Sequence, residues 1–207
     1  MKRPISFLLA VVLVGAMLTA CAHDGSDQDK QPTPTPAPSD PAAFEGQIDA
    51  ILDQLIRQTV AKNILADEEL KSIEYYDKAV DADSCQDILG LTPTEFASDI
   101  VSAMEAKPEG SWFAHSVVLV ECKAGVDVAG LADKIAKGTN PARFGCIKAE
   151  AIVVGYAGQY ILLCASFQNT CDALYTTFSD LSALSPIRID RENDWNDGGM
   201  LGLGLQD

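Results

Sequence analysis

The apolar segment AIVVGYAGQYILLCASF, Ala151 to Phe167, constrains the fold more than any other stretch of the chain. Its two apolar halves are separated by a turn-forming stretch, Gly155 to Gly158, and this pattern predicts a β-hairpin. A second apolar run, SVVLVEC at Ser116 to Cys122, is typical of a buried strand. Strands this apolar need other elements packed on them, so we expect a sheet covered by helices.

Five helices are expected around these strands. In the first, Asp40 and Pro41 supply a cap and a first helical residue for apolar side chains at helical spacing as far as Val60. In TPTEF, Thr92 can cap a helix and Glu95 can reach back to it. The expected helical ranges are 41–60, 67–73, 93–104, 128–138 and 170–181, the last capped by Asn169 or Thr170. The order α-α-α-β-α-β-β-α predicts an α+β fold, a small mixed or antiparallel sheet of about three strands with helices packed on it.

Residues 1–20 have the features of a lipoprotein signal peptide. Lys2 and Arg3 precede an apolar run, Ile5 to Met17, that is shorter than the roughly 20 residues a membrane-spanning helix needs. The run ends in LTAC, which resembles the bacterial lipobox. The resemblance implies cleavage before Cys21 and a lipid anchor, palmitate among its acyl chains, on that cysteine. Two or three acyl chains hold a protein durably, whereas one holds it marginally. The alternatives are a plain cleaved signal with an incidental cysteine, or a short membrane anchor.

Composition divides the rest of the chain into a tether, one domain and a tail. Residues 21–43 contain the lipidated cysteine and five prolines alternating with Thr, Ala and Ser, which predicts a stiff spacer. Residues 44–190 suffice for one α+β domain with a real core but not for two lobes of ordinary size. This size argues against a two-lobed solute receptor. Residues 191–207 form a tail rich in Gly and Asp.

The mature chain is strongly acidic. Without Lys2 and Arg3 it has 13 basic and 30 acidic residues, a net charge of −17. Such a surface repels phosphate backbones and anionic lipid headgroups. We therefore expect no nucleic-acid partner, and we expect the lipid on Cys21 to be the chain's link to the membrane.

The cysteines of the domain favour buried thiols over a disulfide framework. Five cysteines remain once Cys21 carries lipid, and an odd number cannot pair completely within one chain; they are Cys85, Cys122, Cys146, Cys164 and Cys171. One bridge is permitted outside the cytoplasm. Because no two of them form a C-x-x-C, neither a zinc site nor a thioredoxin-like motif is predicted.

No catalytic residue is predicted. The domain has one histidine, His115, so a His-dependent dyad would have to use it. Cys122 lies seven residues further along the same strand, roughly 23 Å away, too far to act as its nucleophile. Other partners from distant loops stay open, but a lone histidine at a strand edge is more often a packing residue.

No metal or cofactor is predicted either. The stretch DADSCQD, Asp81 to Asp87, starts like a calcium-binding loop, but Gln86 stands where that loop needs glycine. Gly125 to Gly130 resembles the start of a phosphate loop but lacks the lysine that follows. Trp112 and Phe113 could stack on a sugar, although a role as packing anchors is favoured. The sequence thus assigns no ligand-binding residues.

The whole-domain pattern is similar to a family of bacterial lipoproteins, mostly from Gram-positive anaerobes, that carry a domain of unknown function. The similarity rests on the lipobox, the polar tether, an early helix, and the segments ELKSIEYY, SVVLVEC and GQYILLCAS. It covers roughly residues 44–184. That family has no assigned activity, so the resemblance implies a lipoprotein without implying catalytic residues.

The expected function is a non-catalytic binding or structural module, lipid-anchored on the extracytoplasmic face of the cell membrane. Its expected partner is a protein or glycan of the cell envelope. Two alternatives stay open. One is an envelope hydrolase that uses carboxylates alone, which would need a carboxylate pair in a cleft. The other is a carrier for a small apolar ligand, which would need a deep apolar pocket.

Overall fold

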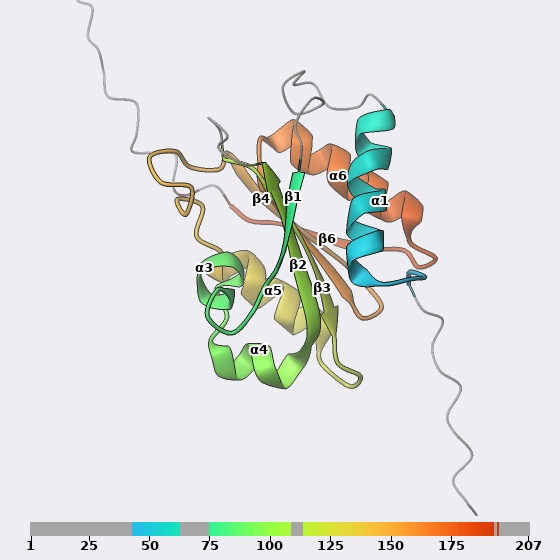
Figure 1. Cartoon of the computed structure of the whole chain (residues 1–207), viewed down its shortest axis with the longest axis vertical. Coiled ribbons are helices and arrows are strands. Elements are labelled where there is room, and N and C mark those ends of the chain that lie inside the picture. The colour runs from blue at the N-terminus through green and yellow to red at the C-terminus, as the bar shows by residue number, and fades with distance from the viewer. Residues whose placement is uncertain (1–42, 63–74, 109–113, 193, 195–207) are drawn as a thin grey trace, which may run out of the picture. The chain divides into compact units, whose positions relative to one another are not determined.

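The computed structural model describes residues 43–62, 75–108, 114–192 and 194, and they belong to one compact unit. Figure 1 shows the arrangement of their helices and strands. In chain order the elements are α1 (Ile48–Ala61), β1 (Tyr75–Ala79), α3 (Cys85–Leu89), α4 (Pro93–Asp99), β2 (Ile100–Pro108), β3 (Ser116–Cys122), α5 (Val128–Gly138), β4 (Ala151–Ala157), β5 (Tyr160–Ser166), α6 (Gln168–Leu181) and β6 (Ile187–Asp190).

The strands form one antiparallel sheet in the order β1-β2-β3-β5-β4-β6. The prediction of about three strands is therefore wrong, because the sheet has six. The element order α-α-α-β-α-β-β-α is wrong for the same reason. The α+β class and the antiparallel pairing do agree with the structure.

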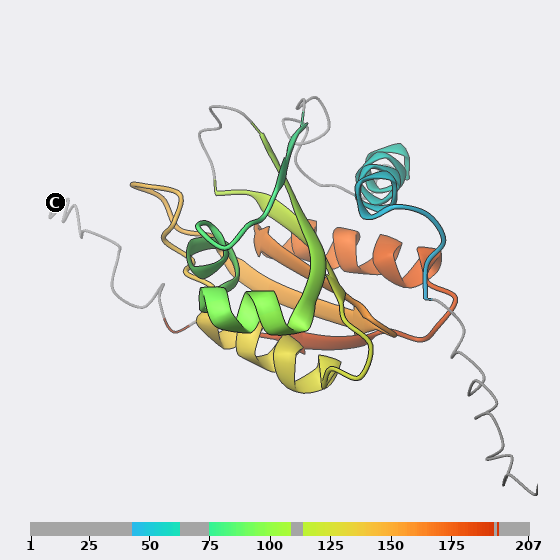
Figure 2. The same ribbon diagram turned by 60° about the horizontal axis from the view of Figure 1, so that its bottom comes forward.

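Helices cover both faces of the sheet. Figure 2 shows α1 and α6 on one face and α3, α4 and α5 on the other. Helix α5 connects β3 to β4 and passes over β5, and α6 connects β5 to β6 and passes over β4. Both connections move toward the β6 edge of the sheet, but they start from β3 and β5, which run in opposite directions. Connections of equal hand must then lie on opposite faces, as α5 and α6 do.

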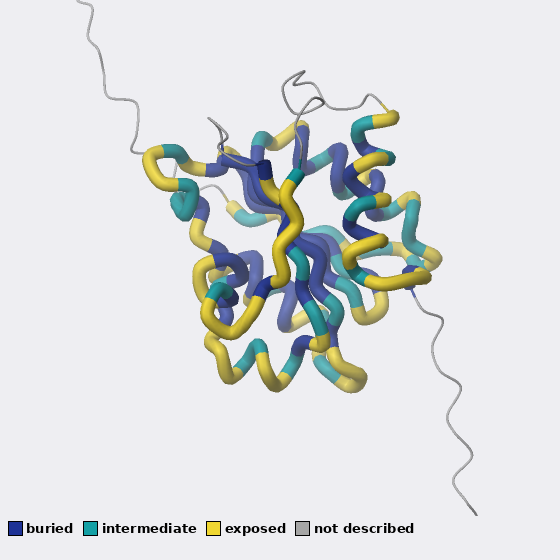
Figure 3. The backbone as a smooth tube through the Cα atoms, viewed as in Figure 1, coloured by how far each residue is buried: buried dark blue, intermediate teal, exposed yellow. Residues whose placement is uncertain are grey.

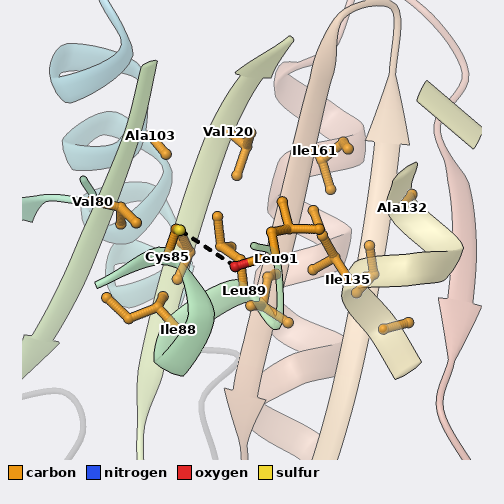
Figure 4. Close-up of a cluster of buried hydrophobic side chains, with 14 of the residues drawn as sticks. Val80, Cys85, Ile88, Leu89, Leu91, Ala103, Val120, Ala132, Ile135 and Ile161 are labelled. Atoms are coloured by element: carbon orange, nitrogen blue, oxygen red, sulfur yellow. Dashed lines mark hydrogen bonds between the residues drawn. The ribbon is translucent and has the colours of Figure 1, made fainter. Parts of the chain in front are cut away.

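Each face has its own apolar core. On the α1 and α6 face, Leu52 and Phe178 pack against strand residues such as Leu119 and Leu162. On the other face, shown in Figure 4, α3 and α5 pack against alternate residues of the same strands. The thiol of Cys85 donates there to the carbonyl of Leu91 at 3.3 Å. The central strands are apolar along their whole length because both of their faces are covered.

The prediction of a helix through residue 104 is wrong, because α4 ends at Asp99 and the chain continues as β2. A β-bulge between Ile100 and Ser102 is the physical reason. The bulge adds one residue, so Ile100 and Ala103, three positions apart, both pack on the α3–α5 side of the sheet. The residues that suggested a helix, Ile100, Val101 and Met104, therefore share no face: Val101 is exposed, and Met104 packs on the side opposite Ile100. The predicted capping box of Thr92 and Glu95 is present.

Other predictions differ in their boundaries. Helix α1 begins at Ile48, seven residues after Pro41, and α6 begins at Gln168 with Phe167 at its N-cap, so the caps predicted at residues 169 and 170 lie inside its first turn. The helix expected over residues 67–73 falls outside the described residues. Strand β3, helix α5 and the hairpin of β4 and β5 are confirmed within their predicted ranges. The turn of the hairpin is shorter than predicted: it is made by Gly158 and Gln159, because Gly155 to Ala157 belong to β4.

Gly90 is expected to tolerate no side chain. It ends α3 with φ of 69°, and a Cβ there would lie 2.2 Å from the backbone carbonyl carbon of Gly138. We expect Gly90→Ala to lower the free energy of unfolding by about 2 kcal/mol, from backbone strain plus displacement of α5. Gly125→Ala is the matched control, because Gly125 has φ of 84° and open space around its Cβ. Equal losses of stability in the two variants, measured by urea unfolding, would contradict the close approach.

Candidate functional site

A pocket of about 380 Å³ lies between helix α1 and the edge strand β1. The α1 residues that line it run along the side of the helix nearest β1. Tyr75 and Asp77, alternate residues of β1, form the opposite wall. The residues contributed by α1 are Asp53, Ile56, Arg57, Val60 and Ala61. Figure 3 shows β1 as an exposed strand in front of the buried centre of the sheet. The pocket therefore has an apolar base and a charged, accessible rim.

The rim of the pocket has two carboxylates and one guanidinium group. Arg57 and Asp53, one turn apart on α1, form a two-bond ion pair, with Nε donating to Oδ1 at 2.7 Å. That carboxylate holds the pKa of Arg57 above its usual range. Partial burial, followed by the charges of Asp53 and Asp49, raises the pKa of Asp77. Within the described residues no cation forms an ion pair with Asp77, so the rim has an excess of negative charge.

The base of the pocket leads to a buried chain of hydrogen bonds. The hydroxyl of Tyr75 lies 2.8 Å from Nε2 of His115, and Nδ1 of His115 lies 2.8 Å from Oγ of Ser166. The tyrosine and imidazole rings also meet edge to face, with centroids 5.4 Å apart. Ser166 is fully buried and His115 is 1% exposed. His115, the residue just before β3, and Ser166 of β5 thus hold Tyr75 of β1 in place at the pocket.

His115 is neutral in this position. Burial lowers its pKa to about 4, so the ring carries a single proton at neutral pH. A neutral imidazole has one N–H donor and one acceptor nitrogen, so one of the two hydroxyls donates to the ring and the other accepts from it. Burial also raises the pKa of Tyr75 well above its usual range. The chain of bonds is thus uncharged and serves to position Tyr75.

A second polar cluster lies at the same end of the sheet, on its other face. Oε1 of Glu105 accepts a hydrogen bond from Oγ of Ser116 at 2.7 Å and one from Nη2 of Arg143 at 2.6 Å. The side chains of Arg143 and Glu105 are 4% and 2% exposed. The guanidinium of Arg143 also lies 4.7 Å above the ring of Phe144. This buried ion pair attaches the loop after α5 to β2 and β3.

The residues that the sequence suggested for other chemistry have structural roles or lie outside the described ranges. Asp81 accepts hydrogen bonds from the amide and hydroxyl of Ser84 and so closes the turn before α3. Groups of three or more metal-binding side chains are absent from the described part of the chain. Cys21, Trp112 and Phe113 lie outside it. All five cysteines of the domain are unpaired thiols, of which Cys146 alone is exposed.

Comparison with family models, with curated proteins and with solved structures gives no match. Of the helices in the described ranges, none is long and apolar enough to cross a bilayer. Function must therefore be inferred from the pocket and from the amino-acid sequence.

The sequence alone did not reveal the pocket. Its two walls come from α1 and β1, and β1 was not predicted as a strand. From the sequence, Cys122 was the only residue weighed as a catalytic partner of His115. Its hydrogen-bond partners in the structure are Tyr75 and Ser166, which are 40 and 51 residues away along the chain. The sheet order, which places β1 and β5 on either side of β2 and β3, was the missing information.

Proposed function

We propose that this chain is an extracytoplasmic lipoprotein, anchored to the cell membrane by lipid on Cys21, whose domain binds an envelope partner without catalysing a reaction. The observation that supports the binding role is the pocket between α1 and β1. It combines an apolar base of Ile56 and Val60 with an acidic rim, and its Tyr75 wall is held by two buried residues. Concave sites with few charged groups on an apolar base are typical of binding sites.

The anchor is tested by Cys21→Ser. We expect the wild-type chain to incorporate an alkyne-labelled palmitate and to sediment with membranes, because two or three acyl chains hold a protein durably. The variant should lose the label and should no longer be retained by acyl chains. Alanine replacement of the exposed Cys146 is the control, because it removes a thiol outside the proposed lipobox. Label that persists in Cys21→Ser would contradict the anchor.

The binding role is tested by photo-crosslinking on intact cells. A benzoylphenylalanine at Ala61 would lie at the pocket, and one at Ala129 would lie on α5, on the other face of the sheet. Both positions are exposed and helical. We expect a discrete adduct from position 61 and none from position 129. Identical adducts from both positions, or none from either, would contradict binding at the pocket.

A second candidate function is glycan hydrolysis by two carboxylates. The observation that favours it is that Asp53 and Asp77 line one pocket, with the pKa of Asp77 raised while Asp53 is paired with Arg57. A carboxyl group with a raised pKa near a second carboxylate of ordinary acidity is the combination that such enzymes use. Release of soluble sugar from wall fragments by the wild-type chain, lost in Asp77→Asn, would favour this candidate over binding alone.

A further inference from the structure

Strand β1 presents an unpaired backbone edge within the described residues. It is the outermost strand of the sheet and pairs with β2 alone. The amide of Val80 donates to the carbonyl of Ala103 at 2.9 Å, and this bond shows which residues at this edge direct their backbone groups toward β2. Because antiparallel ladders alternate, the outward amides and carbonyls belong to every second residue of β1, namely Tyr75, Asp77 and Ala79. These groups can pair with one more strand.

The same alternation places the pocket beside this edge. Tyr75 and Asp77 direct their side chains toward α1, where they line the pocket opposite Val60 and Arg57. In an added strand, the residue opposite Asp77 would direct its side chain to the same face, with its Cβ about 5 Å from that of Asp77. The next side chain on that face, two residues along, would lie opposite Tyr75. A strand on this edge would therefore fill the open side of the pocket.

The other edge of the sheet lacks this combination. Strand β6 has only four residues, and its Arg188 bonds both Asp172 and Asp190. Neither the pocket beside β1 nor the one lined by Phe44 and Leu181 includes a residue of β6. The free edge beside β1 is therefore the one where backbone pairing and side-chain recognition coincide.

Charge favours a basic strand over a second copy of this chain. Burial and the carboxylates of Asp53 and Asp49 raise the pKa of Asp77, and a cation opposite it would relieve that crowding. A two-fold pairing that overlaps all of β1 with a second β1 would set Asp77 opposite Asp77, which is unfavourable. Two mature copies, each with a net charge of −17, would also repel each other.

We propose that β1 accepts an extended, basic segment of a protein partner as a seventh strand, with a lysine or arginine opposite Asp77 and an apolar side chain opposite Tyr75. Backbone hydrogen bonds to the outward groups of β1 give affinity, and the two side chains give specificity. This inference rests on the proposed function, because it names how the pocket between α1 and β1 binds its partner.

The test uses the full-length protein in detergent and the blocked peptide Thr-Val-Thr-Lys-Thr-Val-Thr, titrated by calorimetry. The valines and the lysine of this peptide share one face. When the peptide pairs antiparallel to β1 with its lysine opposite Asp77, the lysine amide bonds to β1 and the amides of the flanking threonines point away. We expect N-methylation of the lysine to weaken binding about tenfold, the cost of one hydrogen bond and a clash, and N-methylation of a flanking threonine to change it less than about twofold.

Substitutions test the charge. We expect Asp77→Asn to weaken the lysine peptide about fivefold to tenfold and to remove its preference over the same peptide with glutamate at the centre. Asp87→Asn on α3 is the matched control, because Asp87 is exposed on the opposite face, and it should leave both affinities unchanged.

Three results would overturn the added strand. They are no binding of the lysine peptide at millimolar concentration, equal effects of the two N-methylations, and equal binding of the glutamate peptide. If one of these results is obtained while the crosslink from position 61 is still observed, binding at the pocket is retained and the added strand is rejected. A glycan or a second copy in that adduct would also overturn the added strand while leaving the binding role intact.

Discussion

Arg143→Met is expected to destabilise the domain by about 3 to 5 kcal/mol, because it leaves the buried carboxylate of Glu105 without its cation. The two side chains are 4% and 2% exposed, so water cannot replace the lost partner without opening the fold. The remaining hydrogen bond from Ser116 does not neutralise the charge. The measurement is urea unfolding at neutral pH, followed by circular dichroism.

Two controls test whether the loss of stability comes from the burial of this ion pair and not from the loss of an ion pair as such. Lys137→Met breaks the ion pair with Asp133, whose side chains are 74% and 49% exposed, and should cost less than about 1 kcal/mol. The double variant Arg143→Met with Glu105→Met removes both buried charges and should recover most of the lost stability, since well-packed apolar replacements of buried pairs are often neutral. A double variant as unstable as Arg143→Met would show that packing around Arg143, and not the orphaned charge, sets the cost.

The elements that the sequence predicted well are those whose burial leaves a strong local pattern. Strand β3 and the hairpin of β4 and β5 are apolar throughout because helices cover both of their faces, and long apolar runs are recognisable without tertiary information. Helix α5 was found from its N-terminal Asp127, which accepts from the amide of Gly130 at 3.0 Å, and from its last residue, Gly138.

The missed strands lack such a pattern for different physical reasons. Strand β1 is exposed along four of its five residues and takes its conformation from pairing with β2 rather than from burial. In β2 the bulge interrupts the alternation of the two faces, so the helix-like spacing of Ile100, Val101 and Met104 does not correspond to one buried face. Strand β6 does alternate, since Ile187 and Ile189 are each followed by a charged residue, but a run of four residues is too short to distinguish from a loop.

The candidate site could not be predicted for a related reason. A pocket between a helix and an edge strand exists only once the edge strand is placed, and β1 is placed by hydrogen bonds to residues about 30 positions later. The same holds for the partners of His115, which approach because β1, β3 and β5 share one end of the sheet.

His115 is expected to make the domain about 2 to 3 kcal/mol less stable at pH 4.5 than at pH 7. Its pKa is about 4 in the folded state, because burial disfavours the charged ring, whereas the unfolded chain has the ordinary value of 6.5. The unfolded state therefore binds the proton first as the pH falls. The contribution of the neutral ring is complete above the unfolded pKa, and it is lost progressively between pH 6.5 and pH 4.

The measurement is urea unfolding across this pH range for the wild-type chain and for His115→Gln. The amide of glutamine has a donor and an acceptor for the hydroxyls of Tyr75 and Ser166 but does not titrate, so the variant should lose most of the pH dependence between pH 7 and pH 5. Glu95, whose pKa is lowered to about 2 by Lys134 and Thr92, contributes equally in both chains and only at lower pH. Imperfect packing of glutamine lowers stability at every pH alike, so the informative quantity is the slope and not the absolute value. Parallel pH profiles for the two chains would mean that another group, and not the buried imidazole, controls the acid sensitivity of the domain.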